Sequence, residues 1–460
     1  MTIMSNALSG ALASQLALSA TSQNIANLQT KGYTRQAALL SAVGADASGK
    51  SVGNGVQVTS LLRFSDGYKS QQMWRAAAEA GQYSQTQPYL TQLERVMGDE
   101  TASLSVAVDG FFAALNAVAG DSVTSTPLRQ QVLTAAGLLA QRFNSLNNVY
   151  NAQRQSLTQQ RGAIVASANA NIDRIAALNA RITQANAVGS PVSSLIDARD
   201  LAIDELAGQM ALEVSEQPGG VRDISLKTGQ ALVIGNVAGT LKAEGAGGGQ
   251  VFSLEFASTR FVLDAEKLGG QLGGLSVYER GTLTSMQDDV AAMASMLEVQ
   301  VNAQLKQGYV MNSTSAVPDG KALFIFTAGA NNMLTVADGL VPADLAFSSD
   351  GSDGDTGNLQ KLLEIDGKTV TFKDKSSATL RDADSQLVGK LGVLSLQNQD
   401  ALATARTMRT HAEEDWQATS GVNQDEEAIN LVEYQNMYQA NMKVMSVANS
   451  LFDATLAMMG

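Results

Sequence analysis

The residues of this sequence that could carry out acid–base chemistry are concentrated in one segment. Four carboxylates and one guanidinium lie within nine residues of one another: Asp197, Arg199, Asp200, Asp204 and Glu205. Paired carboxylates can act as general acid and base when their environments separate their pKa values. Their spacing on a predicted helix over 192–208 instead favours ion pairing with Arg199 inside that helix and stabilisation of the helix N-terminus. We therefore interpret this cluster as structural.

Nucleophilic and metal chemistry have few residues available. The sequence has no cysteine and one histidine, His411, which lies in a charged stretch beside Glu413, Glu414 and Asp415. Zinc sites, iron–sulfur clusters and disulfides need thiols or several imidazoles, and a Ser–His–Asp triad would have to use His411. We predict that His411 is a surface residue. We also predict no catalytic residue, no bound metal and no cofactor.

Three segments rich in glycine or aspartate could be mistaken for ligand-binding loops. The runs 245–249 and 269–274 match neither the dinucleotide fingerprint nor the P-loop, so we interpret both as turns. The segment 349–358 lacks the bidentate glutamate and the glycine register of a calcium loop. We interpret it as a solvated loop.

Composition restricts the partners of the protein. The 460 residues include 31 Lys+Arg against 44 Asp+Glu, a formal net charge of −13, and only 16% are charged. The acidic balance argues against nucleic acid and against anionic membranes. No apolar run is long enough to span a bilayer, and the first 30 residues carry neither a charged side chain nor a cleavable secretory signal. The length predicts roughly two to four domains, with a weakly charged surface that suits subunits packing against many neighbours.

Both ends of the chain have the spacing of amphipathic helices. Apolar and small residues alternate in steps of three and four, which is heptad spacing. At the N-terminus they form a seam of Met4, Ala7, Ala11, Leu18, Ile25 and Leu28. At the C-terminus they form a second seam of Met437, Ala440, Val444, Val447, Leu451, Ala454 and Met458. Neither helix has a partner nearby in sequence. We expect the two ends to pair with each other, antiparallel or bundled, and further helices to pack around them. The alternative is two unrelated helices lying on globular cores.

The middle of the chain alternates between long helices and short strands. A heptad pattern predicts one helix over 128–187, with a stutter where Gln160, Ile164 and Ala168 follow one another in steps of four. Asn-Gly within Val52–Val58 predicts a hairpin or extended arm. The predicted fold is mainly α with β-rich insertions: a bundle of both chain ends, an elongated helical rod (32–208, 270–310 and 386–429), a β-rich subdomain (209–269) and a small β-rich insertion (311–385).

Two terminal motifs resemble those of the axial proteins of the bacterial flagellum. The segment 22–36 resembles the motif that follows the first helix of rod, hook and hook-associated proteins, with Asn24, Asn27, Gly32, Tyr33 and Arg35 at its characteristic positions. The segments 420–427 and 448–453 resemble the C-terminal helix of the FlgK family of hook-associated proteins. In the middle, 194–200 and 301–309 also fit that family, whereas Gln424 and Ala428 depart from its apolar pattern and 311–385 is short for it.

The resemblance implies a structural protein, not an enzyme, located in the secreted flagellum at the hook–filament junction. The terminal segments 1–31 and 430–460 would pair in the inner tube, and the β-rich insertions would point outward. The implied partners are the hook protein, a FlgL-type second junction protein, the export chaperone FlgN at the C-terminal helix, and further copies of the chain in a ring. Export would use the flagellar type III system. The alternatives are another axial protein (hook, rod or FlgL-type), an enzyme with a carboxylate-dependent activity, and a secreted coiled-coil adhesin.

Overall fold

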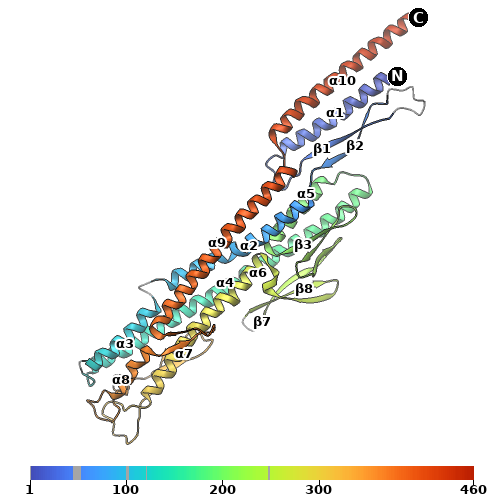
Figure 1. Ribbon diagram of the computed structural model, residues 1–460. Helices are drawn as coiled ribbons and strands as arrows, with labels where there is room; N and C mark the ends of the chain where they lie inside the picture. The colour runs from blue at the N-terminus through green and yellow to red at the C-terminus, as the bar shows by residue number, and fades with distance from the viewer. Residues whose placement is uncertain (1, 45–52, 100–102, 121, 247–248, 460) are drawn as a thin grey trace.

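The computed structural model of the chain is elongated and mostly helical, and both chain termini lie at the same end of it (Figure 1). The structure describes residues 2–44, 53–99, 103–120, 122–246 and 249–459. Small antiparallel β units lie along the middle of the chain. The predicted fold class, mainly α with β-rich insertions, is confirmed.

The first and last helices form an antiparallel pair. Helix α1 (Thr2–Ala26) lies along α10 (Gln424–Met459), so that Gly10 lies opposite Asn441 and Asn24 opposite Glu427. A Cβ atom on Gly10 would lie 2.6 Å from Oδ1 of Asn441, so the two helices approach closely there. The pairing of the chain ends is therefore confirmed, and the interpretation as two unrelated helices is wrong.

A two-stranded ribbon lies beside this pair. Strand β1 (Gln36–Ala42) pairs antiparallel with β2 (Val56–Arg63), and both contact α1. The predicted arm around Val52–Val58 thus supplies β2, although Val52 lies outside the described residues. Isolated two-stranded ribbons are only marginally stable in water, so contact with α1 supports this one.

The rod is built from long helices that run between its two ends. These are α2 (Gly67–Met97), α3 (Leu104–Gly120), α4 (Thr126–Ala187), α5 (Ser193–Gln209), α6 (Gly270–Val277), the π-helical turn η2 (Tyr278–Leu283), α7 (Thr284–Leu305) and α9 (Leu380–Ser420). Helix α4 has 62 residues and is therefore about 93 Å long. Ser125 caps its first turn and Pro127 lies within that turn, where proline costs no hydrogen bond. The long helix predicted over 128–187 is confirmed.

The stutter in α4 lies earlier than its predicted position. The buried residues step from Gln153 to Leu157 to Arg161, two consecutive steps of four, before the pattern continues at Ile164. Gln160 is only half-buried. The predicted position was therefore wrong. Arg161 is buried in place of Gln160, because its charge is compensated by an ion pair with Glu279 of η2 at 2.5 Å.

Two β units project from the rod. The first contains a four-stranded sheet of β3 (Leu212–Glu216), β4 (Arg222–Leu226), β5 (Ala231–Ile234) and β6 (Val237–Ala238), and a three-stranded sheet of β7 (Thr240–Ala246), β8 (Gly249–Phe256) and β9 (Thr259–Leu263), followed by η1 (Ala265–Leu268). The second, at the far end of the rod, contains β10 (Phe324–Phe326), β11 (Leu334–Val336), η3 (Pro342–Asp344), α8 (Gly357–Leu363), η4 (Glu364–Gly367), β12 (Thr369–Thr371) and β13 (Ser377–Thr379).

The glycines predicted as turns have different roles. Gly269 and Gly270 have positive φ angles and do form a turn, but 270–274 continues into α6. A Cβ on Gly274 would lie 2.3 Å from the carbonyl oxygen of Gln82, so this glycine allows α6 to pack on the backbone of α2. Interpreting the whole run as a turn was therefore wrong. In the run 245–249, residues 247 and 248 lie outside the described residues.

One hydrophobic core extends through the rod and into both β units. It includes Val132, Leu139 and Phe143 of α4 and Leu272 of α6, all of which are fully buried. A search of the described helices finds none whose length and apolar character would suit a membrane span.

Candidate functional site

The motif predicted in the N-terminal segment lies where the helix pair meets the rod, a region that we call the joint (residues 24–36, 63 and 420–427). Asn24 is buried and makes four hydrogen bonds. Its Nδ2 donates to the backbone oxygen of Gln36 at 2.8 Å and to Glu427 at 2.9 Å, and its Oδ1 accepts from the Tyr33 hydroxyl at 2.8 Å and from the Gln36 amide at 3.1 Å. One side chain therefore connects α1, the start of β1 and α10.

Tyr33 is held in its neutral form at this position. Burial, followed by the negative charges of Asp197 and Glu427, raises the pKa of Tyr33 to about 12. A neutral phenol can donate its proton to Asn24, which a phenolate could not do. The hydrogen bond at the joint is thus maintained throughout the physiological pH range.

The rest of the motif shapes the turn. Gly32 has a φ of +80°, a left-handed conformation that favours glycine. The Arg35 amide donates to the Ser420 carbonyl at 2.8 Å, and its guanidinium pairs with Glu426 at 2.5 Å and lies over the Phe64 ring at 4.4 Å. Asn27 is half-buried, and its side chain donates to the Gln23 carbonyl at 2.9 Å.

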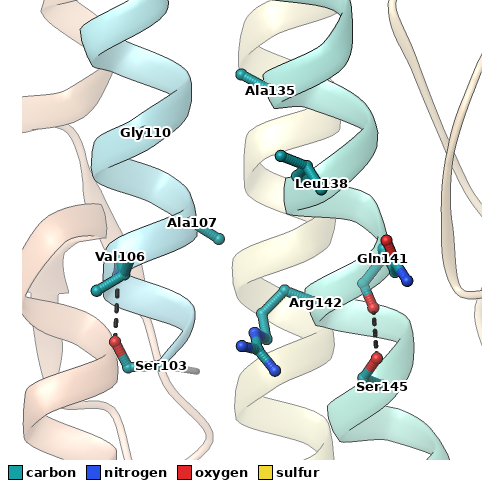
Figure 2. A pocket seen from close by; sticks show the side chains of 9 residues that line it. All are labelled: Ser103, Val106, Ala107, Gly110, Ala135, Leu138, Gln141, Arg142 and Ser145. Atoms are coloured by element: carbon teal, nitrogen blue, oxygen red, sulfur yellow. Dashed lines mark hydrogen bonds between the residues drawn. The ribbon is translucent and has the colours of Figure 1, made fainter. Parts of the chain in front are cut away.

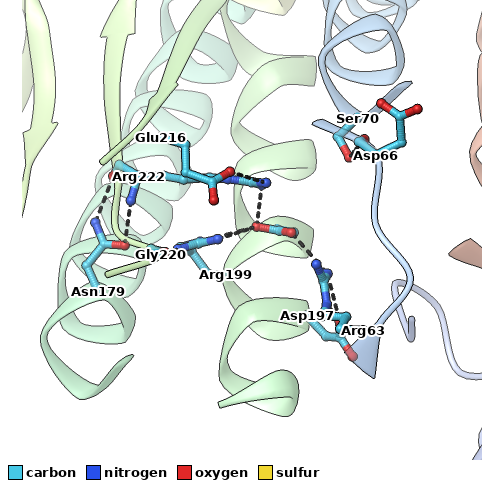
Figure 3. Close-up of polar contacts among 10 residues, drawn as sticks. Arg63, Asp66, Ser70, Asn179, Asp197, Arg199, Glu216, Gly220 and Arg222 are labelled. Carbon is cyan, nitrogen blue, oxygen red and sulfur yellow. Dashed lines mark hydrogen bonds and ion pairs between the residues drawn. The ribbon is translucent and has the colours of Figure 1, made fainter. Parts of the chain in front are cut away.

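The carboxylate cluster of α5 contacts the joint through Arg63, which Figure 3 shows beside Asp197. Asp200 accepts from three arginines, with nitrogen–oxygen distances of 3.2 Å to Arg63, 3.0 Å to Arg199 and 2.7 Å to Arg222. Asp197 pairs with Arg63 at 2.8 Å. The prediction that these carboxylates pair within their own helix was therefore wrong in the main. Arg63 comes from β2 and Arg222 from β4, so the cluster joins the ribbon, α5 and the first β unit.

Burial has a visible electrostatic effect on this cluster. Burial raises the pKa of Asp197, and the charge and hydrogen bond of Arg63 and the backbone amide of Thr34 act in the opposite direction. Asp204, on the same helix, pairs with Arg409 of α9 at 2.8 Å. The ion pairs of Asp197, Asp200 and Asp204 therefore bind α5 to β2, β4 and α9.

The predicted N-terminal seam is divided between the inside and the outside of the helix pair. Ala7 and Ala11 are buried, Leu18 is half-buried, and Met4, Ile25 and Leu28 are exposed. The buried face of α1 consists largely of small residues, whereas a row at intervals of four lies open to solvent: Met4, Leu8, Leu12 and Leu16. As an assembly seam, the predicted set stays a prediction.

The predicted C-terminal seam faces away from α1. All seven of its residues are exposed: Met437, Ala440, Val444, Val447, Leu451, Ala454 and Met458. The half-buried residues follow a second series at heptad spacing: Tyr434, Tyr438, Asn441, Met445 and Ala448. The sequence analysis missed this series because it is mostly polar or aromatic, although its steps of three and four were readable. Between Tyr434 and Ala448, helix α10 thus has one face on α1 and one apolar face that no described residue covers, whereas from 449 to 458 all of its residues are exposed.

The other candidate residues lie apart from the joint. His411 is exposed on α9 and lies 3.3 Å from Glu414, so the prediction of a surface histidine is confirmed. In 349–358, the Asp355 carboxylate accepts from the Ser349 hydroxyl at 2.6 Å. Within the described ranges, no group of three or more His, Asp or Glu side chains is arranged to hold a metal ion.

Comparison with known proteins decides the family. The sequence model described as the flagellar hook-associated protein FlgK helical domain matches residues 90–324, slightly more than half of the chain. The chain belongs to the FlgK family of flagellar hook-associated proteins. A second model, for the C-terminal region of flagellar basal body rod proteins, matches residues 417–458, which contain α10. The chain is thus a structural, axial type of flagellar protein.

Individual relatives extend this similarity to the whole chain. Flagellar hook-associated protein 1 of Escherichia coli K12 is 25% identical over 544 aligned positions that cover 99% of each chain. The protein of the same name from Bacillus subtilis is 25% identical and covers 97% of this chain and 96% of its own. Because the first alignment is much longer than 460 residues, that relative contains segments that this FlgK-family chain lacks, as the short insertion 311–385 suggested.

A solved structure supports the fold. The flagellar hook junction protein FlgK from Burkholderia pseudomallei superposes with a TM-score of 0.52 and 28% identity. The superposition covers 56% of this chain and 47% of that one.

Proposed function

We propose that this FlgK-family chain forms the junction between the flagellar hook and the filament and allows the filament to assemble. The observation that supports this most directly is the pairing of the two chain ends, with an apolar face of each helix left exposed. Among the described residues, none covers Leu8, Leu12, Val444 or Leu451, which are all exposed. Exposed apolar stripes of this length are typical of surfaces that bind other chains.

The same stripes suggest how the subunits are arranged. The terminal helices (1–31 and 430–460) would form the inner tube, with the exposed residues of the predicted seams packed against neighbouring copies in a ring. The rod (32–208, 270–310 and 386–429) would form the outer wall, and the β units (209–269 and 311–385) would point outward. One end of the ring would bind the hook protein, and the other a FlgL-type second junction protein. We assign no catalytic role to any residue.

Export of the chain completes the proposal. We propose that the chain is secreted through the flagellar type III system, which the membership of the FlgK family supports. The exposed face of α10 is suited to the chaperone FlgN, because an amphipathic helix with an unpartnered apolar stripe can dock into an apolar groove. Chaperone binding and ring assembly would then use the same residues in succession.

Deletion of the gene tests the proposal at the level of the organelle. Hooks without filaments, together with flagellin monomers in the medium, are the expected result by electron microscopy and immunoblotting. Cells without hooks would reassign the chain to a rod or hook component. Normal filaments would refute a role at the junction.

A pair of residues tests the role of the α10 face. The double change Val444→Asp and Val447→Asp places two charges on the exposed apolar stripe without touching α1. We expect loss of filaments while the hook is retained. The matched control is Val188→Asp, an exposed valine directly after the C-terminal end of α4, which should leave filaments normal. Equal filament numbers in the two strains would contradict the assignment of the stripe.

A further inference from the structure

The rod has an open groove between α3 and α4, far from the terminal helices (Figure 2). It has a volume of about 530 Å³ and small side chains along its length, among them Ala107 and Ala135. A Cβ built on Gly110 would meet nothing within 4 Å, so the groove is open there. Val106 and Leu138 lie on its two sides, and Leu138 is 60% exposed. Val106 is also 52% exposed, so two large apolar side chains are open to solvent in the same groove and form an apolar patch.

One charge is available in this groove. Arg142 lies one helical turn beyond Leu138, and in Figure 2 its guanidinium extends toward the space between the helices. Among the described residues Arg142 has no ion pair within 4 Å, although its charge opposes the rise that burial causes in the pKa of Asp384. The groove therefore suits an occupant with apolar side chains followed by a carboxylate.

Helix α9 presents such a surface on another part of the rod. Val393 and Leu396 are exposed, Leu396 by 57%, and the exposed Asp400 follows one turn later. Asp400 has no ion pair among the described residues. The spacing of Val393, Leu396 and Asp400 is zero, three and seven, which is also the spacing of Ala135, Leu138 and Arg142 in α4.

The two helices also run in the same direction along the rod. At the far end, Arg129 of α4 contacts the second β unit and Asp384 of α9 contacts Ser105. At the joint end, Asn179 of α4 contacts Arg222, and Arg409 of α9 contacts Asp204. Parallel copies of the chain could therefore match the two series residue by residue.

We propose that the α3–α4 groove receives α9 of a second, parallel copy of this chain. Leu396 of the neighbour packs against Leu138, and Asp400 of the neighbour pairs with Arg142. This contact rests on the proposed assembly of copies but uses the rod, not the terminal helices. It joins two different faces, so it is heterologous and can be repeated from copy to copy.

Leu138 and Leu396 lie at different distances from the joint, so two copies that bring them together must be shifted along the rod. Ser395 is level with Gln87 of α2, and Tyr89 is level with Gln153 of α4. Leu138 lies fifteen residues before Gln153, so it lies about 25 Å farther from the joint than Leu396, at 1.5 Å per residue. Neighbours in contact would therefore be shifted by about 25 Å along the rod.

Because the chain has no cysteine, cross-linking can test the contact cleanly. A variant with Leu138→Cys and Leu396→Cys cannot form a disulfide within one copy, since the Cα atoms of a disulfide lie at most about 7 Å apart. Oxidation of isolated flagella should give a ladder of dimers and higher multimers on immunoblots. The control pair is Leu138→Cys with Val299→Cys, an exposed valine of α7, which should stay monomeric. No ladder from flagella with normal filaments would overturn this contact and leave the proposed function intact.

Charge exchange tests the same contact without cysteines. The two changes are Arg142→Asp and Asp400→Arg. Asp400 is exposed, whereas Arg142 is half-buried and its charge also acts on the buried Asp384, so the folding of each variant is checked by urea unfolding before filaments are counted. Each alone should reduce filament number severalfold by placing like charges together, and the double variant should restore it. A double variant no better than either single one would overturn the pairing. If the double-cysteine variant assembles no filaments, this exchange decides the question instead.

Discussion

Replacing Asp200 with asparagine should destabilise the junction between the ribbon, α5 and the first β unit. The change keeps the shape of the side chain but removes the charge that three arginines share. Arg63 retains Asp197, and Arg222 retains Glu216 at 3.4 Å. Arg199, whose side chain is 2% exposed, loses its carboxylate and keeps the Gly220 carbonyl.

The structure sets the size of the effect. Removing one partner of a buried ion pair typically costs about 3–5 kcal/mol, because the other charge stays buried without compensation. Asp200 is 16% exposed and its arginines keep other partners, so we expect the low end, about 3 kcal/mol in the free energy of unfolding. The control Glu255→Gln removes a surface pair with Lys242, with 42% of the Glu255 side chain exposed, and should cost less than about 1 kcal/mol.

Tryptophan fluorescence offers a local assay. Trp74 is 4% exposed and lies 5.3 Å from the Arg222 guanidinium, so it reports on this cluster once Trp416 is replaced by phenylalanine. Urea unfolding should show a lower midpoint for Asp200→Asn at an unchanged slope. Adding Arg199→Met should recover part of the loss, since the uncompensated charge is removed with it. A midpoint equal to that of Glu255→Gln would refute the reasoning.

Three further changes test other parts of the structure. Asn24→Ala removes four hydrogen bonds and should separate α10 from the ribbon, seen as faster amide hydrogen exchange at Gln36. Gly274→Ala places a Cβ 2.3 Å from the Gln82 carbonyl, so overpacking should cost about 1–3 kcal/mol, measured as a lower Tm, whereas Gly110→Ala should have little effect. Partial burial raises the pKa of Asp355, but hydrogen bonds from the Ser349 hydroxyl and nearby amides outweigh this effect and lower it to about 2. That stabilisation is present above the unfolded value near 4 and is lost as pH falls toward 2, so circular dichroism should show a shallower acid transition for Asp355→Asn.

Local sequence patterns predicted the main helices and strands and their order along the chain. Heptad spacing and the absence of interior proline fixed the extent of α4, and period-two alternation located the first β unit. Heptads at both ends, neither with a local partner, also predicted that α1 and α10 pair. These features depend on local propensity and on the periodicity of apolar residues, both of which can be read from the sequence.

Contacts between distant segments determine which face of each helix is buried and which charged residues form ion pairs. Helix α10 has two series at heptad spacing, and the more apolar one, which includes Val444, is not the one on α1. The small residues of α1 accept the polar and aromatic series of Tyr434 and Tyr438 at close range, a choice that depends on the shape of both helices. Likewise, Asp200 forms ion pairs with arginines of β2 and β4, and Arg161 is buried in an ion pair with Glu279. A charge can be buried only where distant segments bring its counter-charge, so the sequence of one helix cannot reveal it.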